Sequence, residues 1–291
     1  MKRSVKALIS GLAGAALAAT LLVAPAAPAV AAKPKPEDGL PTTEPTKVWN
    51  FTEWESDWVD RDYIGYGAGG RRCSAPYADQ RYIVDGRIVL RVSKETDPAI
   101  IAAQKAECVK SLKGKKMSKS VKALGKKFEK NKATPIYRNA MLSTNGNFAM
   151  QTGTVAARVK FPKDRGMHGG IWLQSDGGSE IDFIESYGYG KAITSVVHTR
   201  YSTGKTKENK LYKKSMKKSW FSKYHVFAVT WDTAKVTFRI DGKVVKTKKL
   251  KTQGNYFLVM SLLSSDWELN KMKSKPSGKM EVDWIKAWAT S

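Results

Sequence analysis

Short segments of alternating apolar and polar residues recur from residue 49 onward, with no helical pattern between most of them. Alternation places successive side chains on opposite faces of a strand, and closely spaced strands favour an antiparallel sandwich. The segments are RYIVDGRIVLRVSKE at 81–95, GTVAARVKF at 153–161, YHVFAVTWD at 224–232, KVTFRIDGKVV at 235–245, NYFLVMSLL at 255–263 and KMEVDWIKAWA at 279–289. Asp85-Gly86 and Asp241-Gly242 suit two-residue hairpin turns. The sequence therefore predicts an all-β sandwich rather than a parallel α/β sheet.

One segment, residues 97–132, departs from the strand pattern. Asp97 can cap a helix, and Pro98 suits the first helical position. Residues 113–132 then hold nine lysines in twenty positions. We interpret 97–132 as a Lys-rich, partly helical insertion between two strands.

The N-terminal residues have the pattern of an export signal. MKRSVK is basic, ALISGLAGAALAATLLV is apolar, and APAAPAVAA offers small residues for cleavage, so residues 1–32 are predicted to be a secretory signal peptide. The apolar run is short and broken by Pro25, which disfavours a membrane anchor, and no later segment is apolar enough to cross a bilayer. Residues 33–46 contain four prolines and are interpreted as an extended linker, which leaves 47–291 for the sandwich. We expect a secreted, extracellular protein.

Export implies an oxidising environment for the chain's two cysteines, Cys73 and Cys108. A disulfide between them would attach the insertion to the loop GYGAGGRRCSAP. Neither cysteine has metal-ligand spacing around it, and the chain has three histidines, so no zinc site is expected.

The net charge is +25, and such a cation accumulates at polyanions such as wall polymers, acidic polysaccharides or nucleic acid. A solvated basic surface that adsorbs nonspecifically explains the charge equally well. Lysine is dense at 105–132, 205–223, 243–251 and 271–279, and we expect some of these segments to be loops that rim a substrate cleft. No nucleic-acid motif and no interleaving of basic with aromatic residues is present, so no nucleic-acid partner is expected.

The segment SEIDFIE, residues 179–185, crowds three carboxylates into six positions. Glu180 and Asp182 share a face of a strand, but regular pleating would send Glu185 to the other face. A β-bulge at Phe183-Ile184 would restore the parity, so that all three acids face one side while the bulged pair packs on the other.

Aligned carboxylates repel one another and raise at least one pKa. A glycoside hydrolase needs this arrangement, because one carboxyl must be ionised and another must hold a proton. The surroundings favour sugar binding, since Trp172, Tyr187 and Tyr189 offer flat apolar faces. Two other interpretations remain open: an ordinary solvated strand face, and a calcium site.

The motif resembles the signature of glycoside hydrolase family 16 in its longer, bulged form, as in laminarinases and agarases. GTVAARVKFPKDRGMHGGIWLQ, ITSVVHT, YHVFAVTWDTAKVTFRIDGKVV and MEVDWIKAWA resemble further family segments in the same order, over about residues 49–290 apart from the insertion. The resemblance implies a concanavalin-like β-jelly roll with an open cleft on its concave sheet. It also implies that 47–291 is a catalytic domain that hydrolyses a β-linked polysaccharide internally, with retention.

The resemblance also implies roles for individual residues. Glu180 is expected to be the nucleophile, Asp182 its assisting carboxylate and Glu185 the general acid/base. The expected substrate-binding residues are Trp172, Tyr187, His168, His198 beside the carboxylates, and Trp267 in a loop over the cleft. No cofactor is required, but a structural calcium is possible because Asp283 and the carbonyl of Gly86 match family positions.

One departure from the family concerns the stretch before Trp172. Members that act on β-1,3-glucan usually have Trp-Pro-Ala where this chain has HGG, so His168 replaces a tryptophan. The replacement removes a stacking platform and weighs against plain β-1,3-glucan specificity.

Three hypotheses follow from these observations. The first is an endo-hydrolase of β-1,3-glucan or mixed-linkage glucan, with hydrolysis of an acidic or substituted polysaccharide, a glycosaminoglycan or galactan, as the alternative. The second is a non-catalytic, lectin-like sandwich, and the third a cationic wall-adhesion protein. A polysaccharide is the expected partner, the chain shows no oligomerisation signal, and we expect a monomer.

Overall fold

The computed structural model describes residues 37, 39–61, 74–112, 126, 130, 135–188, 192–200, 206–249, 254–264 and 278–290. The predicted signal peptide, most of the predicted linker and Cys73 lie outside the described residues, and so does the side chain of Cys108. Secretion and the disulfide therefore stay predictions. Within the described residues, no helix is long and apolar enough to cross a membrane.

The described residues contain sixteen strands and the helix α2. The strands are β1 (Lys47–Trp49), β2 (Val59–Asp60), β3 (Ala75–Pro76), β4 (Arg81–Val84), β5 (Arg87–Lys94), β6 (Tyr137–Ser143), β7 (Gly153–Lys160), β8 (Met167–Ser175), β9 (Glu180–Ser186), β10 (Ala192–Arg200), β11 (Thr206–Ser215), β12 (His225–Trp231), β13 (Lys235–Ile240), β14 (Lys243–Lys249), β15 (Tyr256–Ser264) and β16 (Gly278–Ala289). Helix α2 spans Pro98–Leu112, and two 3-10 turns cover Ala78–Gln80 and Lys218–Ser222.

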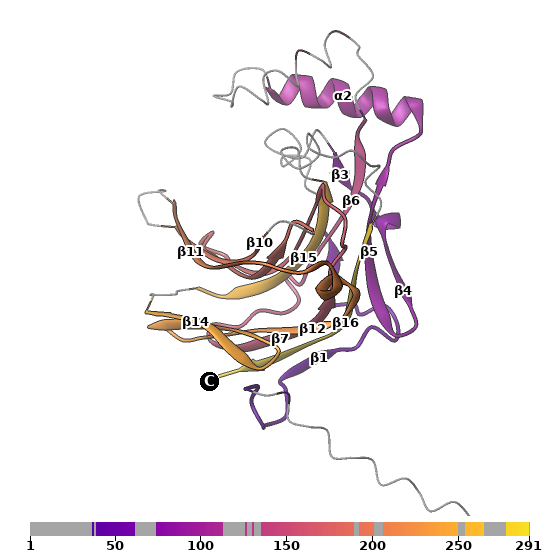
Figure 1. Ribbon diagram of the computed structural model, residues 1–291. Helices are drawn as coiled ribbons and strands as arrows, with labels where there is room; N and C mark the ends of the chain where they lie inside the picture. The colour runs from indigo at the N-terminus through magenta and orange to yellow at the C-terminus, as the bar shows by residue number, and fades with distance from the viewer. Residues whose placement is uncertain are drawn as a thin grey trace, which may run out of the picture. The chain divides into compact units, whose positions relative to one another are not determined.

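The strands form two curved layers (Figure 1). The first has the order β11-β10-β9-β8-β15-β6, and the second the order β5-β16-β7-β12-β13-β14. The layers are joined where β5 pairs with β6, at Ser93 with Arg138 and Lys94 with Tyr137. All neighbours along this path are antiparallel, and β3 alone among the described strands pairs in parallel, with β6. The prediction of an all-β, jelly-roll sandwich is confirmed.

Alternation along the strands explains why the layers pack. The inward residues form one large apolar core to which both layers contribute, for example Ile181 from β9, Leu258 from β15 and Val229 from β12. Burying these side chains contributes roughly 25 cal/mol per Å² of apolar surface, which is the main term that holds the layers together.

The two predicted hairpin turns and the helix cap are present. Asp85 and Asp241 have φ of 50° and 48°, each followed by a glycine of positive φ, as a type I′ turn requires. The Oδ1 atom of Asp97 accepts the backbone N–H of Ala99 at 2.8 Å, and this bond caps α2 where the sequence predicts it.

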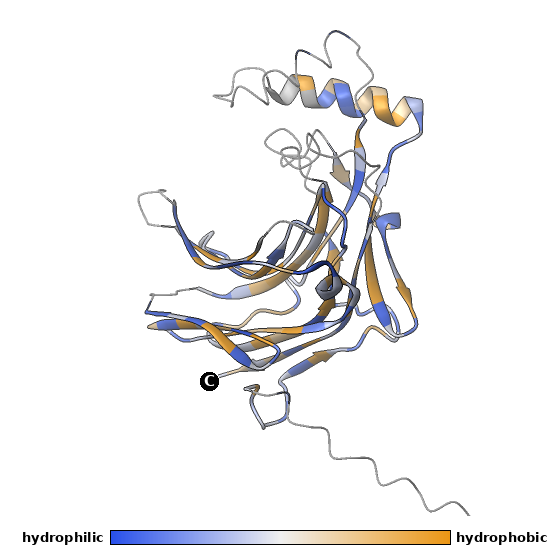
Figure 2. Ribbon diagram, in the orientation of Figure 1, coloured by the Kyte–Doolittle hydropathy of each residue, from blue (hydrophilic) through white to orange (hydrophobic). Residues whose placement is uncertain are grey.

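The lysine-rich segments differ from the expectation. Much of 205–223 forms strand β11 and most of 243–251 forms strand β14, rather than loops. These strands are the two ends of the described strand order, and Figure 2 shows that both are hydrophilic over much of their length. Lysines on an edge strand prevent another chain from pairing with it, which gives them a structural reason independent of any substrate. The segment 113–132 lies almost wholly outside the described residues, as does most of 271–279.

Candidate active site

Strand β9 carries the three acids between β8 and β10, and its register contains the predicted bulge. Ile184 pairs with Ile171 and Asp182 pairs with Trp172, so Phe183 has no partner of its own in β8. The register with β10 shifts at the same level. The Ser195 hydroxyl of β10 donates to the Phe183 carbonyl at 3.0 Å, which satisfies a polar group that the bulge removes from the regular ladder.

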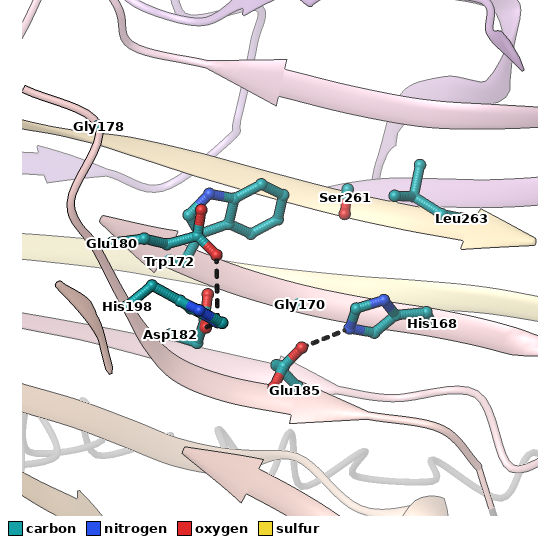
Figure 3. Close-up of a pocket in the computed structure, with 10 residues that line it drawn as sticks. All are labelled: His168, Gly170, Trp172, Gly178, Glu180, Asp182, Glu185, His198, Ser261 and Leu263. Carbon is teal, nitrogen blue, oxygen red and sulfur yellow. Dashed lines mark hydrogen bonds and ion pairs between the residues drawn. The ribbon is translucent and has the colours of Figure 1, made fainter. Parts of the chain in front are cut away.

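The bulge restores the parity of the strand. Ile181, Phe183 and Ile184 are all buried in the core between the layers. Glu180, Asp182 and Glu185 lie on the opposite face and line one cavity of about 320 Å³ (Figure 3). We call this side of the β11-β10-β9-β8-β15-β6 layer the cleft face. The full lining is His168, Gly170, Trp172, Gly178, Glu180, Asp182, Glu185, His198, Ser261 and Leu263.

Glu185 is held by three donors: one from β8, one from β10 and one from the residue next after β9. His168 Nε2 lies 2.8 Å from Glu185 Oε1, and the Tyr187 hydroxyl donates to the same oxygen at 3.1 Å. The Thr194 hydroxyl donates to Oε2 at 2.8 Å. Burial alone would raise the pKa of Glu185, but the hydrogen bond and charge of His168, with the bonds from Thr194 and Tyr187, lower it to about 2.

Glu180 and Asp182 form a second unit with His198. Asp182 has a side chain that is 5% exposed, its Oδ2 lies 3.3 Å from His198 Nε2, and Glu180 Oε1 lies 3.9 Å from the same nitrogen (Figure 3). Burial, then repulsion by Asp182 and the hydrogen bond between the two carboxyls, raise the pKa of Glu180 to about 9. Burial, then repulsion by Glu185, also hold the pKa of Asp182 well above its ordinary value. The pair therefore keeps at least one proton near neutral pH.

The aromatic residues predicted from the sequence have different surroundings. Trp172 lines the cavity and packs on the cleft-face cluster Met141, Phe257, Val259 and Leu263, so it belongs to both a core and a binding surface. Tyr187 does not line the cavity directly; its ring stacks on His168 with centroids 4.3 Å apart and 18° between planes. Trp267 lies outside the described residues.

The contacts of His168 go beyond the expected role in substrate binding. As a substitute for a tryptophan it was predicted to bind substrate in the cleft, and it does line the cavity. Its ring nitrogen, however, is directed at a carboxylate of the site, and its ring face is covered by Tyr187.

Sequence reasoning missed Thr194 and the cavity-lining pair Ser261 and Leu263. Thr194 pairs with Glu185 across the β9–β10 ladder. The signal was available in ITSVVHT, because a strand that ends in a cleft-facing His198 must place Val196 and Thr194 on the same face. Nothing comparable marks Ser261 and Leu263, since β15 is apolar on both faces.

The predicted calcium position does not suit a cation. The Asp283 carboxylate is hydrogen-bonded to the Arg158 guanidinium and lies 3.8 Å from Arg87 Nε, so two cations already compensate it. Gly86 is the second residue of the β4–β5 turn with φ of 66°, and this conformation explains the glycine without a metal. Within the described residues, the one cluster with metal-ligand spacing is Glu180, Asp182 and His198. Those atoms are the ones that hydrolysis of a glycoside would use, and we assign no metal to them.

The fold and site define a carbohydrate-active sandwich with a carboxylate-lined cleft, and comparison with protein-family models agrees. The model for glycosyl hydrolases family 16 matches residues 102–286. The chain belongs to this family and is a glycoside hydrolase. No curated protein matches the chain in sequence.

Solved structures of similar fold come from several organisms. The laminarinase catalytic domain from Thermotoga maritima MSB8 superposes with a TM-score of 0.61 at 14% identity, covering 85% of this chain and 98% of that one. The endo-β-1,3-glucanase from Pyrococcus furiosus gives 0.59 at 19% identity, covering 83% and 92%. A family 16 protein from the mixed-linkage glucan PUL of Bacteroides ovatus, in complex with a G4G4G3G product, gives a TM-score of 0.59 at 16% identity, covering 82% of this chain and 98% of that one.

Proposed function

We propose that the chain is a secreted, retaining, endo-acting glycoside hydrolase whose substrate is a β-1,3-glucan or a mixed-linkage β-glucan. The observation that carries the proposal is the cleft-face trio of Glu180, Asp182 and Glu185, brought onto one side of β9 by the bulge at Phe183. The substrate class is supported by fold similarity to enzymes described as acting on laminarin-type and mixed-linkage glucans.

The mechanism assigns one task to each acid. Glu180, as carboxylate, attacks the anomeric carbon while Glu185 gives a proton to the departing glycosidic oxygen, and a covalent glycosyl ester forms. In the second step Glu185 takes a proton from water, the water oxygen bonds to the anomeric carbon and the ester to Glu180 breaks. Two inversions leave the anomeric configuration unchanged.

Asp182 holds the proton that the two carboxyl groups share, so that Glu180 can be ionised. The side chain of Asp182 is 5% exposed and that of Glu180 31%, so ionising Asp182 costs more desolvation energy. The shared proton then resides on Asp182, which donates to Glu180 and leaves it ionised as nucleophile. His198 beside both oxygens stabilises the negative charge of the pair.

A second substrate class, an anionic polysaccharide, is favoured by charges on the cleft face. Lys210 pairs with Val196, which pairs with Asp182, and Lys213 is related in the same way to Glu185 through Thr194. Partners in register share a face of the sheet, so both lysines project from the cleft face at its β11 edge. Lys210 already contacts Glu208 at 3.1 Å on this face, and together with Lys213 it would bind carboxylate or sulfate groups of a chain that crosses the strands.

Two further properties rest on the sequence. Residues 1–32 support export with cleavage of a signal peptide, and Cys73 with Cys108 would then form a disulfide in a monomeric extracellular protein. Mass spectrometry of the secreted chain, with and without reduction, tests both properties.

Release of reducing ends from laminarin, lichenan, agar-type galactans, hyaluronan and chondroitin tests the function. We expect cleavage of laminarin or lichenan, initial products with retained anomeric configuration by NMR, and loss of at least 10³-fold in kcat for Glu180→Gln. Cleavage of a charged polymer instead would establish the second class. Binding without cleavage of any polymer would favour the lectin-like alternative and reject the proposed activity, and binding that disappears in high salt and is unaffected by Glu180→Gln would favour wall adhesion.

A further inference from the structure

The contact between His168 and Glu185 is the feature of the site that the two-carboxylate mechanism does not explain. The two residues lie 17 positions apart in the chain and come together because β8 and β9 pair. His168 Nε2 is 2.8 Å from Glu185 Oε1, and the side chains are 16% and 15% exposed. A largely shielded contact of this length between an imidazole and a carboxylate is a strong, charge-assisted hydrogen bond when the pair carries the extra proton.

The orientation of the imidazole is fixed by its neighbours. The ring of Tyr187 stacks on it at 4.3 Å, and the Tyr187 hydroxyl donates to the same Glu185 oxygen. Thr194 occupies the other carboxylate oxygen. Glu185 is thus centred among three donors, and each of them favours its ionised form.

This arrangement conflicts with the task of an acid. A carboxyl whose pKa is lowered to about 2, by His168, Thr194 and Tyr187 acting against burial, holds no proton of its own near neutral pH. The proton for the leaving group must therefore be kept beside Glu185 rather than on it, and the imidazole has the reach and the chemistry for this.

We propose that His168 is the positioning residue and proton partner of Glu185, holding on Nε2 the proton that Glu185 delivers to the leaving oxygen. This inference rests on the proposed function. In the first step the Nε2 proton passes to Glu185 Oε1, and Glu185 transfers a proton to the glycosidic oxygen as the bond to the anomeric carbon breaks. The imidazole is then neutral and Glu185 ionised. In the second step Glu185 takes a proton from the attacking water, and the proton returns to the pair.

The charges around His168 support this state. From β9, Glu180, Asp182 and Glu185 face the cavity, and from β10 His198 lies beside Asp182. The neighbouring strand β15 contributes Ser261 and Leu263, which do not titrate in the physiological range. An ionised Glu185 carboxylate can only accept a hydrogen bond, so the 2.8 Å contact places a proton on the Nε2 atom of His168.

The pH dependence of kcat/KM separates a proton partner from a structural residue. His168→Gln keeps an N–H that can donate to Glu185 but cannot release a proton. A pair that shares a proton loses it at a higher pH than either member could alone, so we expect the alkaline limb to move down by at least one pH unit in the variant. Activity should then fall at least tenfold near pH 7.5 and recover toward wild type at lower pH. An equal loss at every pH would reduce His168 to a structural role and overturn the proposal.

His225→Gln is the matched control. His225 also contacts a carboxylate, with Nδ1 at 2.8 Å from Asp241 Oδ2, and its ring also stacks on an aromatic ring, that of Trp220 at 4.2 Å. It lies outside the cavity lining. Its substitution is expected to leave the position of both pH limbs unchanged.

A second readout needs no substrate and decides the proposal even if no polymer in the panel is cut. Carboxyl 13C NMR of the wild type, with Glu185→Gln to assign the signal, should show Glu185 titrating near the pKa of about 2. In His168→Gln the midpoint should rise by at least one unit toward the ordinary value. An unchanged midpoint in a variant whose thermal unfolding is cooperative would overturn the proposal, whereas an inactive wild type with the shifted midpoint would reject only the proposed function.

Discussion

Glu180 and Asp182 lie two residues apart on β9, and burial, together with repulsion by neighbouring carboxylates, raises the pKa of each. Glu185 lies on the same face with a lowered pKa, because its three donors outweigh burial. Neighbouring acids with pKa values pushed in opposite directions are typical of acid/base sites, since the environment decides which group holds a proton. Because these pKa values differ from those of the unfolded chain, the free energy of unfolding must depend on pH.

We predict that Glu180→Gln stabilises the protein at alkaline pH. The pKa of Glu180 is raised to about 9 from 4.5, so the folded pair of Glu180 and Asp182 holds a shared proton that the unfolded chain releases between these values. The contribution of this bound proton to the stability of the folded state is complete below pH 4.5 and declines as pH rises toward 9. The variant avoids this loss, and we expect a gain of about 1–2 kcal/mol near pH 8 and none near pH 4.5, reduced because the side chain is partly exposed.

Thermal unfolding across pH measures this gain, at about 2–4 °C in Tm per kcal/mol for a chain of this size. Glu44→Gln is the control, because Glu44 is an exposed carboxylate outside the cavity lining. A Tm for Glu180→Gln equal to or below that of the wild type at pH 8 would contradict the prediction.

At the level of elements, the bulge in β9 determines whether three acids can act together. Its extra residue, Phe183, packs in the core, and the carbonyl of Phe183 depends on the Ser195 hydroxyl of β10. Ser195 is 1% exposed, so water does not easily replace its hydroxyl. The position of Glu185 therefore depends on a neutral hydrogen bond on the neighbouring strand.

We predict that Ser195→Ala lowers both stability and activity. Leaving the Phe183 carbonyl without its donor should cost about 1–2 kcal/mol, measured by denaturant unfolding. Relaxation of the bulge should displace Glu185 and lower kcat about tenfold or more. Ser93→Ala is the control, because Ser93 also donates its hydroxyl at 2.7 Å, to Gln80, but from β5 outside the site. Equal kcat values for the two variants would show that the bulge carbonyl does not position Glu185.

The bulge in β9 could be predicted from the sequence, whereas the contact that depends on strand register could not. Parity alone required an extra residue between Asp182 and Glu185, because two acids separated by an odd number of positions cannot share a regular strand face. The contact between His168 and Glu185 could not be predicted in the same way. It depends on the register of β8 against β9, and the bulge itself shifts that register by one residue.

For the whole molecule, the question is what the net charge of +25 does. The sequence predicted basic loops, but within the described part of the chain the lysines of β11 and β14 lie on edge strands, where charge prevents pairing between molecules. In β11 the register with β10 shifts between Lys210 and Tyr212, so Lys210 and Lys213 both lie on the cleft face, whereas Leu211 and Tyr212 pack against the core. Adsorption and catalysis can thus use different lysines of one molecule.

Salt and charge removal should separate these two roles. We predict that adsorption to an anionic polysaccharide weakens steeply between 0.05 and 0.5 M salt, roughly the range over which the screening length falls from ~14 Å to ~4 Å. Hydrolysis of a neutral β-glucan should change less than about twofold over the same range, because its binding depends on stacking and hydrogen bonds within the cavity.

The variant Lys210→Gln/Lys213→Gln removes two charges from the cleft edge, and Lys246→Gln/Lys248→Gln removes two from β14 at the other end of the strand order. Both should weaken adsorption by similar factors, because long-range attraction depends on net charge. If the substrate is a neutral glucan, kcat/KM should stay within about twofold of wild type for both. If it is anionic, only the cleft-edge variant should lose about fivefold or more at low salt, because only those ammonium groups lie on the face that the glycan crosses. An equal loss of kcat/KM in both variants would mean that hydrolysis depends on the total charge and not on the position of the lysines. That result would contradict a specific role for Lys210 and Lys213 at the cleft.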